Sequence, residues 1–237
     1  MVALLLLPLI WSSPPRGLPP GAVDRRALRE IDPAVLWCRD DGRLAVLSDP
    51  TRFRATYPVG GVGPRKSGAS FLVELPPRDT ATLTYRVRFD EGFDFVRGGK
   101  LPGLAGGTAT TGKDPVTGDG WSARFMWRRR GDLVLYLYHL DQPKDYGEDF
   151  ATGVRMVPGR WYQIRQRVTV NTPGVRDGRI EVWIDGRSVL DLDDVRLRTG
   201  DAAPVDRFYF STFHGGSGRR WAPSKTQGAE FADIRVE

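Results

Sequence analysis

The sequence of 237 residues contains little cysteine and little histidine. Cys38 is the only cysteine, so the chain cannot form an internal disulfide, and we expect Cys38 to be a buried, unreactive thiol. The two histidines, His139 and His214, are far apart, and with one thiol they give no cluster with the spacing of a metal site. We therefore expect no metal in the chemistry and no cofactor, and only a structural Ca²⁺ ion stays open.

Long apolar runs and helical periodicity are also scarce. Met1–Trp11 is apolar but too short to cross a bilayer, and it resembles the hydrophobic part of a secretory signal. It lacks a basic start and a clear cleavage site, so the alternative is a disordered or packed N-terminal arm. We expect a secreted protein with a signal-like or disordered segment at residues 1–22 and a single domain at residues 23–237.

The charge balance permits several partners. The formal net charge is +6, which suits nucleic acid, an anionic membrane or an acidic polysaccharide. The cations are mostly arginines dispersed along expected strands, and no Lys/Arg run is long enough to form a nucleic-acid tail. The sequence therefore argues against nucleic acid and against a membrane span, and an anionic polysaccharide fits better.

Glycine, proline and period-two alternation are abundant. With 28 Gly and 18 Pro, the chain has the composition of many short strands joined by turns. We expect strands near residues 44–48, 51–58, 69–75, 81–89, 121–128, 133–140, 161–170, 178–184, 187–192, 208–213 and 230–236. This pattern predicts an all-β fold of two curved antiparallel sheets, a β-jelly-roll or concanavalin-like sandwich. The polar stretches Thr108–Gly120 and Asp141–Gly153 are expected to be loops that border a binding groove.

One lysine stands in an unusual sequence context. Lys100 follows Gly98 and Gly99 and precedes Leu101-Pro102. Glycine lets a backbone approach a ligand closely and proline stiffens the chain, so we expect Lys100 beside a ligand. The alternative is an ordinary turn residue.

The next two expected strands bring polar side chains to one face. In Trp121–Arg128 alternation places Ser122 and Arg124 on the same face, and Tyr136 and Tyr138 share a face of the following strand. Hairpin pairing would bring the two tyrosines beside Ser122 and Arg124. A lysine, an arginine and two tyrosines without a carboxylate suit an anionic ligand.

Each of these residues also has a simpler explanation. Tyrosine pairs on a sheet are more often cross-strand packing, and arginines at alternate strand positions are usually solvated. The acidic pair Glu181 and Asp185 could suggest a glycosidase, but a strand running into an Asp-Gly turn explains it.

Seven segments together resemble polysaccharide lyase family 14, which comprises alginate and glucuronan lyases with a β-jelly-roll fold; the glucuronan lyases of family 20 look similar. The resemblance extends from Arg52 to Val236. The segments are G-G-K-L-P-G-L (98–104), W-S-A-R-F-M-W-R (121–128), Y-L-Y (136–138), P-G-R-W (158–161), Q-R-V-T-V-N-T-P-G (166–174), I-E-V-W-I-D-G (180–186) and F-S-T-F-H-G-G-S (210–217).

The resemblance implies a site and a reaction. The family's active-site lysine, serine, arginine and two tyrosines fall on Lys100, Ser122, Arg124, Tyr136 and Tyr138. Such lyases remove the C5 proton of a uronate and expel the 4-O-linked chain, leaving an unsaturated uronate end.

For this chain we expect the cations, Arg124 foremost, to neutralise the substrate carboxylate and to lower the pKa of a tyrosine that acts as the base. Either Tyr136 or Tyr138 could be that base, and one of them or Lys100 would return a proton to the leaving oxygen. We assign Ser122, Arg54 and His214 to substrate binding. His214 is expected to line the groove.

The competing hypothesis is a non-catalytic, lectin-like sandwich that binds anionic polysaccharide. It would share the cationic and aromatic face but need no activated base. We expect a monomer, and the choice between alginate and glucuronan stays open.

Overall fold

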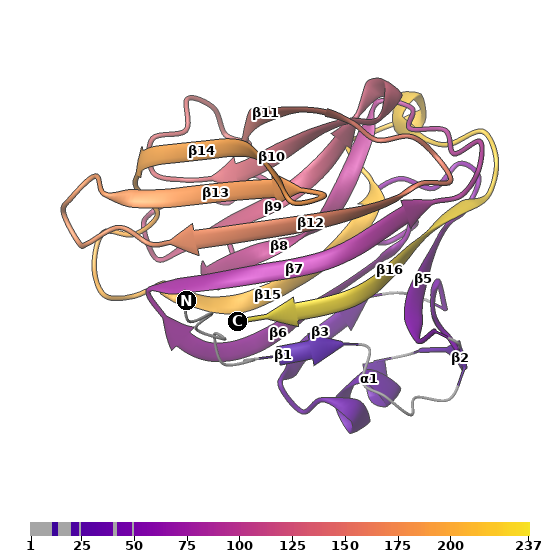
Figure 1. Cartoon of the computed structure of the whole chain (residues 1–237), viewed down its shortest axis with the longest axis horizontal. Coiled ribbons are helices and arrows are strands. Elements are labelled where there is room, and N and C mark those ends of the chain that lie inside the picture. Colours follow the sequence, from indigo (N-terminus) through magenta and orange to yellow (C-terminus); the bar gives the residue numbers. More distant parts are fainter. Residues whose placement is uncertain (1–10, 14–19, 24, 40–41, 49) are drawn as a thin grey trace, which may run out of the picture.

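The computed structural model describes residues 11–13, 20–23, 25–39, 42–48 and 50–237. These residues form two antiparallel β-sheets packed face to face, as Figure 1 shows, so the predicted all-β sandwich is confirmed. They also form one α-helix, α1 (Arg25–Ile31), and two 3₁₀ turns, η1 (Arg129–Gly131) and η2 (Arg219–Trp221). No helix in this part of the chain is long and apolar enough to cross a membrane. Most of the expected signal-like segment lies outside the described residues.

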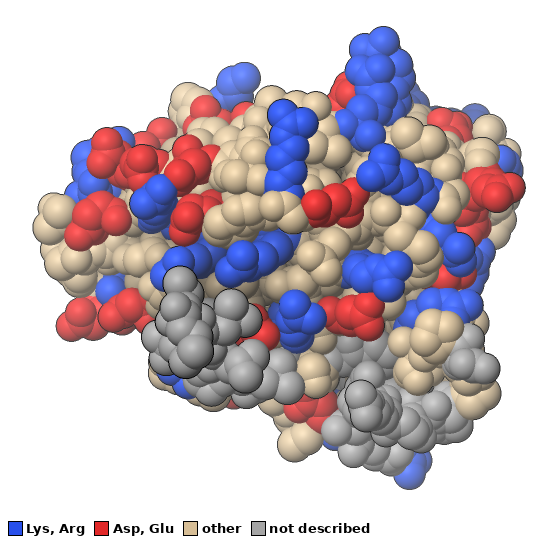
Figure 2. Space-filling view, viewed as in Figure 1, with Lys and Arg blue, Asp and Glu red and all other residues tan. Residues whose placement is uncertain are grey.

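The nine-stranded sheet has the order β14-β13-β12-β7-β16-β5-β4-β2, and β1 also pairs with β16. Its strands are β1 (Trp11–Ser13), β2 (Gly21–Ala22), β4 (Leu44–Leu47), β5 (Arg52–Tyr57), β7 (Thr80–Phe89), β12 (Trp161–Thr169), β13 (Gly178–Ile184), β14 (Arg187–Val195) and β16 (Gln227–Val236). On the outer face of this sheet Lys and Arg alternate with Asp and Glu, as the side-by-side blue and red of Figure 2 show. Ion pairs such as Arg179 with Asp191 and Arg88 with Glu230 compensate these charges.

The seven-stranded sheet has the order β11-β10-β9-β8-β15-β6-β3. Its strands are β3 (Val35–Arg39), β6 (Ala69–Arg78), β8 (Gly98–Gly107), β9 (Gly120–Arg128), β10 (Asp132–Tyr138), β11 (Glu148–Arg155) and β15 (Val205–His214). Between the two sheets lies one apolar core, to which β9 contributes Trp121, Ala123, Phe125 and Trp127. The predicted inward face of that strand is therefore confirmed, and its other side chains point away from the core.

The glycine-rich segment around Lys100 forms a strand, β8, so the alternative that Lys100 is an ordinary turn residue is wrong. An added Cβ at Gly99 would lie 2.0 Å from the Trp127 ring, and one at Gly106 would lie 2.4 Å from Nε1 of Trp121. These glycines are therefore needed to seat two buried tryptophans rather than to admit a ligand. Pro102 is tolerated because the pairing with β9 shifts register between Leu101 and Gly103, where a bulge removes the need for a ladder N–H.

Three further expectations need correction. The edge strand β3 was not predicted, and Cys38 within it is half-buried rather than buried. The expected loop Asp141–Gly153 contains most of β11, whose polar composition suits an exposed edge strand. The loop between β8 and β9 occurs where it was predicted.

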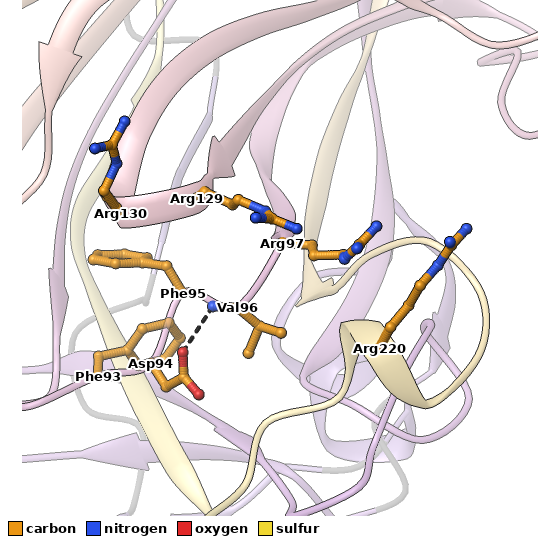
Figure 3. Close-up of a pocket in the computed structure, with 8 residues that line it drawn as sticks. All are labelled: Phe93, Asp94, Phe95, Val96, Arg97, Arg129, Arg130 and Arg220. Carbon is orange, nitrogen blue, oxygen red and sulfur yellow. Dashed lines mark hydrogen bonds between the residues drawn. The ribbon is translucent and has the colours of Figure 1, made fainter.

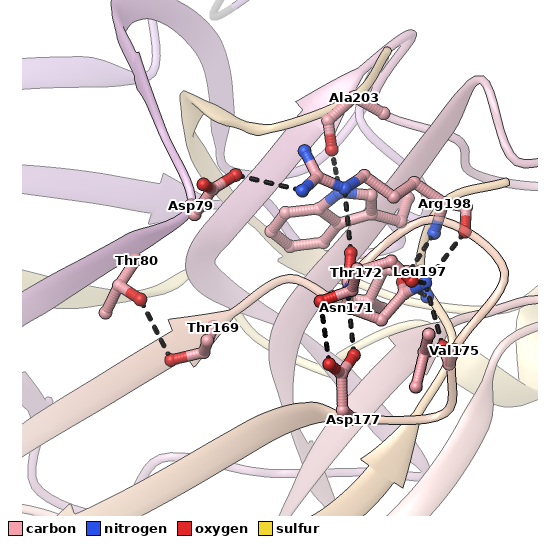
Figure 4. Close-up of polar contacts among 11 residues, drawn as sticks. Asp79, Thr80, Thr169, Asn171, Thr172, Val175, Asp177, Leu197, Arg198 and Ala203 are labelled. Carbon is pink, nitrogen blue, oxygen red and sulfur yellow. Dashed lines mark hydrogen bonds and ion pairs between the residues drawn. The ribbon is translucent and has the colours of Figure 1, made fainter. Parts of the chain in front are cut away.

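A network of hydrogen bonds and an ion pair links two of the connections between the sheets, β6–β7 and β14–β15 (Figure 4). Asn171, 1 % exposed, accepts hydrogen bonds from the backbone N–H groups of Leu197 and Arg198 and donates to the Arg198 carbonyl. The Arg198 side chain donates to the Asn171 carbonyl and pairs with Asp79 at 2.9 Å. Since Asp79 lies between β6 and β7, and Arg198 lies between β14 and β15, the network fixes two crossovers from one sheet to the other.

Candidate functional site

Five of the predicted site residues, Lys100, Ser122, Arg124, Tyr136 and Tyr138, meet on the outer face of the seven-stranded sheet, here called the site face. Antiparallel pairing places Tyr136 opposite Arg124 and Tyr138 opposite Ser122, as the hairpin pattern predicted. On the other side of β9, Lys100 of β8 lies opposite Met126. Alternation along three adjacent strands thus gathers these side chains away from the core.

Lys100 is buried among apolar and aromatic atoms. Its Nζ lies 3.1 Å from the centroid of the Tyr136 ring and 2.9 Å from Sδ of Met126, and the residue is 9 % exposed. Burial lowers the pKa of Lys100 well below its usual value, and the positive charges of Arg124 and Arg128 lower it further. These surroundings therefore favour the neutral amine, the form that can accept a proton.

Arg124 is a buried cation without an ion-pair partner in the described part of the chain. It is 2 % exposed, its Nη1 donates to Ser211 Oγ at 3.3 Å, and its guanidinium lies 4.7 Å from the centroid of the Tyr209 ring. Its Nε has no hydrogen-bond acceptor. Because a buried charge is costly unless it is paired, this arrangement suits an anion from outside the chain.

The two tyrosines differ in their surroundings. Their hydroxyl oxygens lie 3.5 Å apart, and the Tyr138 hydroxyl donates to the Gly112 carbonyl at 3.1 Å. Burial raises the pKa of Tyr136, and so does its hydrogen bond with Tyr138. The positive charges of Arg124 and Arg128 lower the pKa of Tyr136, as expected, but burial outweighs them and the net shift is upward.

Two loops cover the site face. Ser122 Oγ donates to the Thr110 carbonyl at 2.7 Å, and Val116 packs against the cluster of Met126, Tyr136 and Tyr138. On the opposite side, Gly147 lies against the Tyr138 ring. Both stretches belong to the loops that the sequence analysis placed beside the groove, and they leave the site side chains almost fully covered.

Arg54 and His214 do not lie on the site face. Arg54 is on β5 of the other sheet, where its guanidinium donates two hydrogen bonds to Asp90 at 2.8 and 2.7 Å. His214 is 0 % exposed and stacks on Phe93 within the core, and burial lowers its pKa to about 4. The predicted positions of both residues in the substrate site are therefore wrong. The Arg54 guanidinium is already paired with the Asp90 carboxylate, and the His214 ring lies inside the sandwich.

The structure adds aromatic and polar residues that the sequence analysis did not select. Tyr209 supports Arg124 and makes an edge contact with Trp37 at 5.6 Å between ring centroids. Met126 contacts Lys100, and Arg128 lies 5.6 Å from the Tyr136 ring while pairing with Asp149. The alternation of Phe208, Tyr209 and Phe210 could have indicated that Tyr209 points outward, since the two phenylalanines are buried in the core.

Within the described residues, no group of three or more His, Cys, Asp or Glu side chains is arranged to hold a metal ion. The site instead consists of a buried amine, a buried guanidinium and phenol hydroxyls. The arrangement can therefore bind a carboxylate and transfer a proton next to it.

Comparison with known proteins defines the class. Residues 48–234 match the polysaccharide lyase 14 family. The chain therefore belongs to this family and is a polysaccharide lyase. A search of curated proteins found no match.

Solved structures of lyases share the fold. The alginate lyase Aly36B superposes with a TM-score of 0.84 at 26% identity, over 98% of this chain and 97% of that one. A variant of Aly36B in complex with an alginate trisaccharide gives a TM-score of 0.86 at 25% identity, over 97% and 98% of the two chains.

More distant lyases show the fold alone. The alginate lyase of Aplysia kurodai gives 0.80 at 24% identity over 98% and 99% of the chains. The endo-β-1,4-glucuronan lyase of Trichoderma reesei gives 0.57 at 13% identity, over 85% and 90%.

Proposed function

We propose that the protein cleaves a polyuronate by β-elimination and that alginate is its first candidate substrate. The observation that carries the proposal is the pairing of two buried cationic groups: Arg124, which has no carboxylate partner in the described residues, and Lys100, whose pKa is lowered by burial. One can receive the uronate carboxylate while the other accepts a proton.

The reaction begins with neutralisation of the carboxylate. The C5 proton of a uronate is weakly acidic because the neighbouring carboxylate resists a second negative charge. Arg124 can donate two hydrogen bonds to that carboxylate, and its burial strengthens the interaction as enolate-like charge develops. Tyr209, on which the guanidinium stacks, holds it in position.

Lys100 is the proposed base. The neutral amine takes the C5 proton, the C5 electron pair forms the C4–C5 double bond, and the C4–O4 bond to the leaving chain breaks. The resulting ammonium, or the Tyr138 hydroxyl, then protonates the leaving oxygen. This assignment replaces Tyr136 as a candidate base, since a phenol with a raised pKa is a poor base near neutral pH.

Two considerations support alginate. The alginate lyase Aly36B covers nearly the whole chain at 26% identity, and an Aly36B variant was solved with an alginate trisaccharide. The similarity to the glucuronan lyase is at 13% identity, so that enzyme argues for the fold only.

The test is an absorbance assay for unsaturated uronate ends. Polymannuronate, polyguluronate and polyglucuronate are each incubated with the wild type and with Lys100→Ala, Arg124→Ala and Tyr138→Phe. We expect Lys100→Ala and Tyr138→Phe to lower kcat about 100-fold or more with polymer binding largely kept, whereas Arg124→Ala weakens both. Lys225→Ala removes an exposed lysine and serves as the matched control.

The outcomes separate the hypotheses. Polymer binding by the wild type without any rise in absorbance would favour a non-catalytic carbohydrate-binding sandwich. A Lys100→Ala variant that turns over at the wild-type rate would remove Lys100 as the base.

A further inference from the structure

A second cationic cluster surrounds a pocket beyond the end of β8 and β9. The pocket has a volume of about 460 Å³ and is lined by four arginines, Arg97, Arg129, Arg130 and Arg220, together with the stretch Phe93–Val96. We call it the arginine pocket. In Figure 3 the four arginines form an arc along one side, and Asp94 lies across from them.

The arginines come from three separate segments. Arg97 directly precedes β8, Arg129 and Arg130 belong to η1 between β9 and β10, and Arg220 belongs to η2. Trp221 fixes η2 against the sheet, since an added Cβ at Gly98 would lie 3.5 Å from its ring. The convergence is therefore a product of the fold.

The positive charge of this pocket is not compensated within the described residues. None of the four arginines forms an ion pair there, in contrast to the paired arginines on the outer face of the nine-stranded sheet. Asp94 is the single carboxylate of the lining, and its Oδ1 accepts a hydrogen bond from the Val96 N–H at 2.9 Å. Four mutually repelling guanidinium groups against one engaged carboxylate suit an external anion.

The pocket wall is also strained. Val96 has φ of 50° and Arg130 has φ of 61°, in the left-handed region that β-branched and long side chains seldom adopt. Such conformations cost free energy and concentrate at functional sites, where the surrounding structure holds them. Val96 and Arg130 are direct neighbours of Arg97 and Arg129, so these backbone conformations help to direct the two arginines toward the pocket.

The pocket lies close to the site face. In the register of β8 and β9, Lys100 is opposite Met126 and Gly98 is opposite Arg128, and Arg97 precedes Lys100 by three positions along the chain. Three residues of extended chain span roughly 10 Å. Arg128, 5.6 Å from the Tyr136 ring, lies between the site face and η1.

We propose that the arginine pocket is a distal subsite that binds uronate carboxylates of the same polymer whose reacting unit lies beside Lys100 and Arg124. The inference rests on the proposed function for its substrate class. Planar guanidinium groups bind carboxylates through two donors, and repeated carboxylates along one chain reach both sites at once. The pocket therefore favours long chains over short ones.

The test measures binding without turnover, in the Lys100→Ala background. The triple variant Arg97→Gln/Arg129→Gln/Arg130→Gln is compared with Arg165→Gln/Arg167→Gln/Arg187→Gln, which removes the same charge from exposed positions of the nine-stranded sheet. The ligands are a long polymannuronate and a mannuronate trisaccharide. Thermal unfolding of each variant checks that it is folded.

We expect the pocket variant to lose about tenfold in affinity for the long polymer, with trisaccharide affinity changed less than about twofold. Its polymer affinity should also depend less on salt concentration, because fewer charges contribute. The control variant should bind the polymer nearly as the parent does. Equal losses for both ligands, equal losses in both variants, or no loss would overturn the subsite.

Failure of this inference differs from failure of the lyase assignment. Wild-type protein that gives no unsaturated ends with any uronate rejects the reaction, while the binding measurements still report on the pocket. Cleavage with an unchanged polymer affinity in the pocket variant rejects only the subsite.

Discussion

Lys100 shows how surroundings can change the chemistry of a residue. An exposed lysine is a cation near neutral pH, but here burial and the positive charges of Arg124 and Arg128 disfavour the ammonium form. A guanidinium, by contrast, is hardly ever deprotonated in proteins. We therefore propose different roles for the two residues, Lys100 as the base and Arg124 as the partner of the substrate carboxylate.

The acidic limb of the kcat/KM profile tests the role of Lys100. The base must be unprotonated, so activity should rise with pH through the Lys100 pKa, below the usual range of lysine. Arg128 lowers this pKa and Asp149 raises it. We therefore expect Arg128→Gln to move the limb to higher pH and Asp149→Asn to move it to lower pH.

This pair of variants contains its own control. Both substitutions break the same Arg128–Asp149 ion pair, so a purely structural effect would shift the two profiles in the same direction. Shifts of the same sign, or none, would argue against Lys100 as the titrating group.

At the scale of the element, β8 combines a structural and a chemical task. Its glycines make room for the tryptophans of β9, and between them Lys100 and Leu101 point to opposite faces. The bulge at Pro102 shifts the register with β9, so that Leu104 again points into the core. A glycine-rich strand can thus hold the lysine proposed as the base, because the tryptophans of β9 fill the space that the glycines leave.

Gly99→Ala tests this view of β8. The new methyl would meet the Trp127 ring and the Phe213 carbonyl, and we expect a loss of about 1–3 kcal/mol or more in the free energy of unfolding. Urea unfolding measures it. Gly200→Ala is the matched control, since its Cβ meets nothing within 4 Å, and its stability should stay within about 0.5 kcal/mol of wild type. A Gly99→Ala protein as stable as the control would contradict the packing argument.

At the scale of the whole molecule, stability depends on how the two sheets are joined. Two of the connections between the sheets, β6–β7 and β14–β15, are linked to each other by the network of Asn171, Arg198 and Asp79. This network lies outside the site face. It therefore offers a way to change stability without touching the residues proposed for chemistry.

Asn171→Leu should destabilise the fold strongly. It keeps a similar volume but leaves the buried N–H groups of Leu197 and Arg198 without their acceptor, which we expect to cost roughly 3 kcal/mol or more. Thermal and urea unfolding measure the change. Thr172→Val, which removes an exposed hydroxyl bond to Asp177, is the control and should cost under about 1 kcal/mol. Equal small losses would show that the network is not needed to join the sheets.

The sequence by itself determined most of the strands, their faces and much of the site, although β3, β8 and most of β11 were not predicted as strands. Strict alternation fixes which side chains share a face, so the neighbours Arg124 with Tyr136 and Ser122 with Tyr138 could be predicted from one hairpin. The tertiary structure alone decided what surrounds each group. Burial of Lys100 and Tyr136, the engagement of Arg54 by Asp90 and the position of His214 inside the core all depend on strands distant in sequence. Local periodicity predicts the face to which a side chain points. It does not predict desolvation or ion pairing, because these arise only when separate parts of the chain pack together.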